Sequence, residues 1–210
     1  MKKSCAPAGD LLISLRKVRF MPPVILSMVS PGTEPVLAGR LDGKRTFARL
    51  LEMLPALQEP TVVILDFRSV SLATSSYLSE AVLALRDHLR LRRVPAYTVI
   101  ANLNEKVRDE FDELLGRAHD AFLACDLSED EQVSNPQVIG YLEPKLRQIF
   151  DLARSKGEVG ATDLHANAGE TESVGPTAWN NRLNALAEKG LLREFSAGRA
   201  KRYRPVLEAA

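Results

Sequence analysis

The sequence has few cysteines and histidines and lacks long apolar runs. Cys5 and Cys125 are far apart and lie in no metal-ligand spacing, which excludes a disulfide framework and a zinc site. No apolar stretch approaches the roughly 20 residues that a transmembrane helix needs. The opening residues also lack the apolar segment of a secretory signal. We therefore expect a cytoplasmic protein that does not enter the membrane.

Motifs for catalysis and cofactor binding are absent as well. The chain has no Gly-rich phosphate loop, and its three histidines, His88, His119 and His165, are isolated from one another in sequence. The acids at 109–113 follow the spacing of a solvated helix face rather than that of a catalytic pair. Nothing assembles a nucleophile, a base and an oxyanion site, so we expect no enzyme, no metal site and no cofactor.

Length and charge are compatible with two small domains. The 210 residues carry a net charge of +1, which is unevenly distributed. Residues 1–144 have a formal charge of −2 and residues 145–210 have +3, counted from the sequence. A mildly acidic body with a basic tail is compatible with nucleic-acid binding but does not require it.

Apolar periodicity predicts an α/β plan for the first two thirds of the chain. Runs rich in β-branched residues predict strands at 11–20, 23–29, 61–67, 95–102 and 121–125. The run at 61–67 is continuous, which is typical of a strand buried on both faces. Residues spaced three and four apart predict helices at 44–54, 75–92 and 104–118, the last capped by Asn104. An acid-rich stretch that ends in Asn135-Pro136 indicates a solvated boundary.

The last third has a different pattern. We predict a helix at 144–157, a short helix or turn at 160–169, and a helix at 175–190. The first and third helices open on proline and close on glycine, as helix ends prefer. Two short strands around a Ser-Ala-Gly turn follow as a hairpin.

Two adjacent serines, Ser75 and Ser76, stand at the start of the helix that follows the buried strand. The stretch "VVILDFRSVSLATSSYLSEAVLAL" resembles STAS-like domains, the relatives of anti-sigma-factor antagonists, of which an uncharacterised branch is most similar. Asp66 matches the acid at the strand end and Glu80 the acid that follows the serines, whereas Thr74 and Tyr77 depart from the phosphorylated motif. The resemblance covers roughly residues 37–125.

The serine pair has two interpretations. A serine at a helix start satisfies first-turn amides, which stabilises a helix by about 1 kcal/mol. The resemblance instead implies phosphorylation by a kinase-like partner, which would put negative charge where the helix dipole favours it. Capping is the interpretation that the sequence favours, and phosphorylation of Ser75 or Ser76 stays open.

The predicted helix at 175–190 has one apolar and one polar side. Trp179, Leu183, Leu186 and Ala187 lie on one side, and Thr177, Asn181, Asn184 and Glu188 lie on the other, with Asn180 and Arg182 at the margins. Asparagine can bond adenine in the major groove, and threonine can contact a thymine methyl or a phosphate. We therefore expect the polar side to enter a DNA groove; a solvated surface is the alternative.

The predicted hairpin is basic. Arg202 and Arg204 share one face of a strand, and we expect Tyr203 to join Phe195 on the other face and to cover the core. Such a ribbon suits phosphate anchoring beside a base-reading helix. The expected phosphate contacts are Arg182, Arg199, Lys201, Arg202 and Arg204.

Residues 145–206 resemble the helices and wing of winged-helix transcriptional regulators. The expected architecture is an α/β STAS-like domain with a central mixed sheet, followed by a small α+β winged-helix domain. The expected boundaries are 1–35 for N-terminal strands that precede or join the sheet, 36–126 for the STAS-like domain, 127–143 for a linker and 144–210 for the winged helix.

These resemblances imply a transcriptional regulator that binds double-stranded DNA and uses its STAS-like domain for interaction or dimerisation. Winged helices often act as dimers on paired half-sites, so a homodimer is compatible with this interpretation. The alternative is a protein-interaction module of a partner-switching pathway, in which the STAS-like domain binds a kinase-like protein and the winged helix is an adaptor.

Overall fold

The computed structural model describes residues 22–30, 35–168, 175–198 and 200–207. The predicted strand at 11–20 and most of the expected N-terminal region 1–35 therefore lie outside the described residues. The predicted strand at 23–29 is confirmed as β1.

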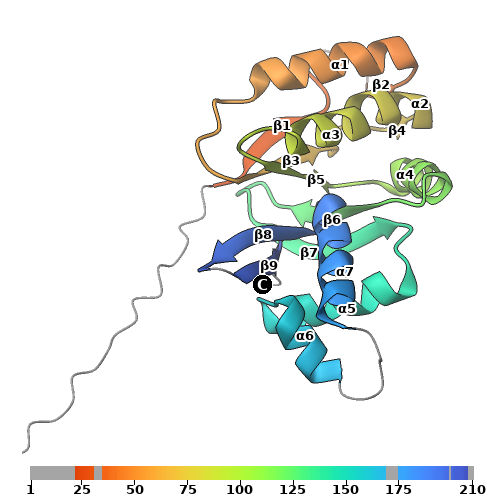
Figure 1. The fold of residues 1–210 in the computed structure, drawn as a ribbon. Coiled ribbons are helices and arrows are strands. Elements are labelled where there is room, and N and C mark those ends of the chain that lie inside the picture. Colours follow the sequence, from red (N-terminus) through yellow and green to blue (C-terminus); the bar gives the residue numbers. More distant parts are fainter. Residues whose placement is uncertain (1–21, 31–34, 169–174, 199, 208–210) are drawn as a thin grey trace, which may run out of the picture.

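A mixed five-stranded sheet forms the centre of the molecule (Figure 1). Its strands, in spatial order, are β1 (Val24–Ser27), β3 (Thr61–Asp66), β5 (Ala96–Ala101), β6 (Ala121–Leu127) and β7 (Val133–Gly140). The first four strands are parallel, and β7 pairs with β6 in the antiparallel direction. The α/β expectation with a central mixed sheet is confirmed.

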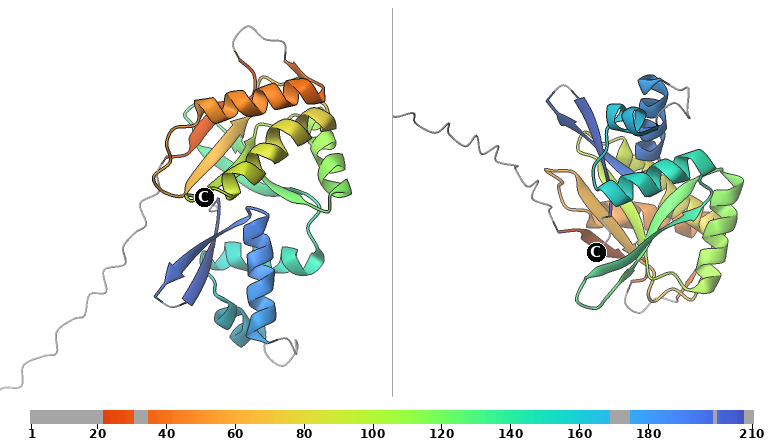
Figure 2. Two further views of the ribbon diagram at one scale, coloured as in Figure 1. Left: turned by 45° about the horizontal axis from the view of Figure 1, so that its top comes forward. Right: turned by 90° about the horizontal axis from the view of Figure 1, so that it is seen from below.

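Helices cover one face of this sheet, and the last third of the chain covers the other (Figures 1 and 2). The first face is covered by α1 (Arg40–Met53), α2 (Ser75–Leu78), the π-helical turn η1 (Ser79–Leu83), α3 (Ala84–Arg90) and α4 (Glu105–Arg117). A small parallel pair, β2 (Val36–Leu37) and β4 (Leu72–Ala73), lies beside them. The helix predicted at 75–92 is thus one run with a π-helical middle.

The second face is covered by the C-terminal elements. These are α5 (Pro144–Lys156), α6 (Ala161–Ala168), α7 (Pro176–Glu188) and the hairpin of β8 (Leu192–Ala197) and β9 (Ala200–Pro205). Val159 adds an antiparallel bridge to Tyr203 of β9, with N–O distances of 3.0 and 2.9 Å. The predicted order of three helices and a hairpin is confirmed.

The centre of strand β3, residues 62–65, is apolar because it is buried on both faces. Val63 and Leu65 belong to the core under α1–α4, whereas Val62 and Ile64 belong to the core under the C-terminal elements. The second cluster also contains Leu183 of α7. Because the C-terminal elements share a core with the sheet, the division into separate domains at 36–126 and 144–210 stays a prediction.

The segment 127–143, which we expected to be a linker, contains the edge strand β7. Ile139 is 2% exposed and completes the first core cluster. The Asn-Pro step that indicated a turn lies inside β7, where Asn135 takes a positive φ of 48°. Proline is tolerated there because an edge strand need not donate every amide. The acidic residues instead form the connection between β6 and β7.

Candidate functional site

Helix α7 presents its two sides as the sequence predicts. Trp179, Leu183 and Leu186 are buried, while Thr177 and Asn181 are exposed on the opposite side. The structure gives neither of these two polar side chains a hydrogen-bond partner among the described residues. They are therefore available to an outside partner.

Two of the candidate DNA-reading residues are already engaged. The Tyr203 hydroxyl donates to Asn184 Oδ1 at 2.5 Å and lies 3.3 Å from Asn180 Oδ1. The Tyr203 side chain is fully buried, and burial together with the nearby Glu194 raises its pKa. A buried hydroxyl needs a partner, and the side-chain oxygens of these two half-buried asparagines serve that purpose.

The arginines of β9 are paired with two carboxylates, Glu158 of the connection between α5 and α6 and Asp163 of the first turn of α6. Arg202 Nε lies 2.8 Å from Glu158 Oε1, and its Nη1 lies 2.6 Å from Asp163 Oδ2. Arg204 Nη2 lies 2.7 Å from Glu158 Oε2. Burial alone would raise the pKa of Glu158, but the hydrogen bonds from both arginines outweigh it and lower that pKa. The two arginines are thus locally neutralised.

The other cations expected to contact phosphates are Lys201, Arg182 and Arg199. Lys201 pairs with Glu194 at 2.9 Å, and the Arg182 guanidinium lies 5.0 Å from the centroid of the Trp179 ring. Arg199 lies outside the described residues. The ribbon is basic in sequence, but each described cation of β9 has an acid beside it.

The faces of the hairpin differ from the expectation in one respect. Phe195 is opposite Arg202 in the register, so it shares the face of the arginines, and the Arg204 guanidinium lies 4.8 Å from the centroid of its ring. Tyr203 is buried as expected, but its cross-strand neighbour is Glu194. The expectation that Phe195 joins Tyr203 over the core is wrong.

Sequence reasoning did not find the acids that neutralise the arginines. Glu158 and Asp163 flank Gly160, and the Gly160 amide donates to Asp163 Oδ2 at 3.1 Å. An acid three residues into a helix that reaches back to the preceding amide is half of a capping box, and that spacing was readable from the sequence. The pairing with β9 spans 39 to 46 residues and had no local signal.

The helix start at Ser75 and Ser76 is capped by Thr74 and not by either serine. Thr74 Oγ1 accepts from Tyr77 N at 3.4 Å and from Gly39 N at 3.3 Å. The Ser75 amide donates to Glu110 Oε2 at 2.9 Å, and the exposed Ser76 places its Oγ 3.2 Å from Thr74 Oγ1. The capping interpretation is right about the place but wrong about the residue.

The capping assignment leads to a prediction for stability. Thr74→Ala should lower the free energy of unfolding by about 1 kcal/mol, because two backbone amides lose their acceptor. Ser76→Ala is the matched control and should change it by less than about 0.5 kcal/mol. Urea unfolding of the two variants tests this, and equal losses would contradict the assignment.

Across the described ranges, no three His, Cys, Asp or Glu side chains are grouped as metal ligands would be. Cys125 is buried, and burial, with Asp126 and Asp66 nearby, raises its pKa to about 12. No helix in the described part of the chain has the length and apolarity to cross a bilayer. The expectation of a non-enzyme stays a prediction.

Comparison with known proteins adds no family. No protein-family model matches the chain, and no match was found among curated proteins or solved structures. The resemblances to STAS-like domains and winged helices therefore stay predictions.

Proposed function

We propose that the chain is a DNA-binding transcriptional regulator whose C-terminal elements form a winged helix. Supporting the proposal is the order α5, α6, α7, β8 and β9, with Val159 bridged to β9 as a short third strand. In helix-turn-helix proteins generally, the second helix of the motif enters the major groove. Here that helix is α7.

The observation that supports the proposal most is that the polar side chains of Thr177 and Asn181 are exposed and unpaired among the described residues. Both are exposed near the start of α7, and both lack a described partner. Asn181 can form the bidentate bond to adenine, and Thr177 can contact a phosphate or a thymine methyl. We assign Asn180 and Asn184 no base contact, because their side-chain oxygens bind the Tyr203 hydroxyl and so connect α7 to the hairpin.

Asn181 provides the test. Purified protein is used to select a site from random oligonucleotides, and fluorescence anisotropy then measures affinity at stated salt. Asn181→Ala should weaken specific binding by about tenfold or more, since a bidentate base contact contributes about 1–3 kcal/mol. The control is Gln148→Ala, which removes an exposed amide from α5 and should leave affinity unchanged. Failure to select any site, or equal losses in both variants, would contradict DNA reading by α7.

The second candidate function is the protein-interaction module of a partner-switching pathway. The pairing of Arg202 and Arg204 with Glu158 favours it, because a neutralised hairpin attracts phosphates weakly. A protein that shows no DNA affinity at low salt and retains an ATPase-fold partner in a pull-down would support this function instead.

The two serines differ as candidates for phosphorylation in such a pathway. A phosphate on Ser75 would lie close to the Glu110 carboxylate, which accepts from the Ser75 amide, so Ser76 is the better candidate for a kinase. A homodimer and a cytoplasmic location stay predictions.

A further inference from the structure

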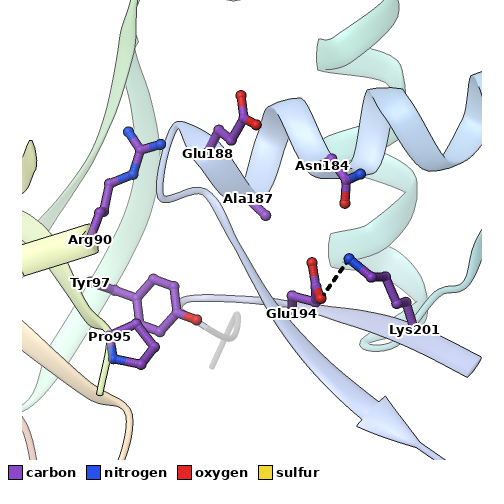
Figure 3. A pocket seen from close by; sticks show the side chains of 8 residues that line it. All are labelled: Arg90, Pro95, Tyr97, Asn184, Ala187, Glu188, Glu194 and Lys201. Carbon is purple, nitrogen blue, oxygen red and sulfur yellow. Dashed lines mark ion pairs between the residues drawn. The ribbon is translucent and has the colours of Figure 1, made fainter. Parts of the chain in front are cut away.

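A cleft of about 380 Å³ lies between the sheet side of the molecule and the C-terminal elements (Figure 3). Residues from α3 and β5 form one wall, and residues from α7 and the hairpin form the other. Its polar lining residues are Arg90, Asn184, Glu188, Glu194 and Lys201, and its less polar ones are Pro95, Tyr97 and Ala187. Such a joint between two parts of a chain is a common place for a small-molecule site.

The charges of the cleft are balanced but not fully paired. It contains two cations and two anions, of which Lys201 and Glu194 form an ion pair at 2.9 Å. This leaves Arg90 and Glu188. Arg90 has one long ion pair, to Asp87 at 4.0 Å, and the nearby Glu188 acts on it electrostatically without forming an ion pair. Neither Arg90 nor Glu188 is therefore held in a close ion pair within the described part of the chain, and each can contact a ligand.

Arg90 is in a setting that favours an added anion. Its side chain is 29% exposed, and burial, followed by the neighbouring Arg86, lowers its pKa, although Asp87, Asp120 and Glu188 offset part of this effect. A carboxylate in the cleft would offset both effects, and a guanidinium can bind a carboxylate through two parallel hydrogen bonds. Glu188 is exposed, and apart from its electrostatic effect on Arg90 it forms no ion pair with the described residues.

The rest of the cleft supplies apolar surface and neutral hydrogen-bonding groups. Figure 3 shows the Tyr97 ring and Pro95 below Arg90, with Asn184 and Lys201 across the cleft. Burial raises the pKa of Tyr97, so its hydroxyl stays protonated. Asn184 Oδ1 is engaged by Tyr203, which leaves its amide nitrogen as a donor. These groups suit a short ligand with an apolar part.

We propose that this cleft binds a small zwitterion of the amino-acid class, with its carboxylate on Arg90, its ammonium group on Glu188 and its side chain on Tyr97 and Pro95. A ligand with a single charge would form an ion pair with only one of these two groups. The bound zwitterion would connect α3 and β5 to α7, and this inference does not depend on the proposed DNA binding.

Thermal denaturation of the full chain tests the site. The probes are the standard amino acids, with acetate and ethylamine as singly charged comparisons at equal concentration. At least one amino acid should raise the Tm in a saturable way, because a ligand that binds only the folded state stabilises it. Arg90→Gln and Glu188→Gln should each weaken that binding by about tenfold or more.

Two control variants show whether removal of any exposed charge, rather than of a cleft residue, weakens binding. Arg92→Gln and Glu52→Gln each remove one exposed charge outside the cleft, and both should keep the affinity of the unmodified chain. Near-ultraviolet circular dichroism confirms that each variant is folded. The proposal is overturned if no amino acid gives a saturable shift. It is also overturned if acetate or ethylamine binds as tightly as the best amino acid, or if the shift persists in both cleft variants.

Discussion

Replacing Gly140 with alanine should destabilise the fold by more than about 3 kcal/mol, because backbone conformation and packing both oppose a side chain at this position. Gly140 ends β7 with a φ of 76°, a region that L side chains rarely adopt. A Cβ there would lie 2.5 Å from Leu115 Cβ and 2.7 Å from the Asp120 carbonyl oxygen. Neither neighbour can move easily, since Leu115 is fully buried in the core and Asp120 contributes backbone.

Gly116 is the matched control for this prediction. It lies in α4, and a Cβ added to it would meet nothing within 4 Å. Gly116→Ala should therefore stabilise the protein by about 0.5–1 kcal/mol, since alanine restricts the unfolded chain and favours helix. Urea unfolding at constant pH measures both variants. A Gly140→Ala protein as stable as the unmodified chain would show that the end of β7 is not closely packed against Leu115 and Asp120.

The order of helices and strands could be predicted because it depends on short stretches of sequence, such as helix-end residues and apolar runs. Pro144 opens α5 and Gly157 follows its end, and Asn104 Oδ1 accepts from Val107 N at 2.9 Å as a helix cap. The continuous apolar run of β3 follows from its two buried faces. Strand β7 was missed because only part of it is buried and because it contains a proline, two properties that an edge strand tolerates.

The state of the candidate site could not be predicted, because it depends on register and on distant partners. A shift of one residue in a hairpin exchanges its two faces. The sequence suggested a Ser-Ala-Gly turn, but Ala197 pairs with Ala200, and Phe195 is therefore on the arginine face. The partner of Arg204 is Glu158, 46 residues earlier, and no periodicity connects them. Exposure of Asn181 was predictable because it depends on the helix period alone.

A second large effect is expected at Asp120, which joins the sheet side of the molecule to α7. Asp120 Oδ2 lies 2.7 Å from Arg86 Nη1, an ion pair without a well-aligned hydrogen bond, and Oδ1 lies 3.1 Å from Lys189 Nζ. The Arg86 side chain is 7% exposed. Asp120→Asn would leave Asp87 as the one described carboxylate paired with this buried guanidinium, with Asp87 Oδ1 at 3.1 Å from Arg86 Nε. We expect a loss of about 3 kcal/mol, because removing one partner of a buried ion pair leaves a charge that the exposed Asp87 compensates only in part.

The same carboxylate should make stability depend on pH. Burial alone would raise the pKa of Asp120, but Arg86, the Ala121 amide and Lys189 outweigh it and hold that pKa below its ordinary value. A lowered pKa in the folded state contributes stability above the ordinary carboxyl pKa, and this contribution is lost as the pH falls through the lowered value. Urea unfolding between neutral and acidic pH should therefore show a smaller loss of unfolding free energy for Asp120→Asn than for the unmodified chain.

The control for both experiments is Asp42→Asn, whose exposed pair with Arg45 should contribute less than about 1 kcal/mol to stability. If the two variants lose equal stability at neutral pH, Asp120 does not join these two parts of the molecule.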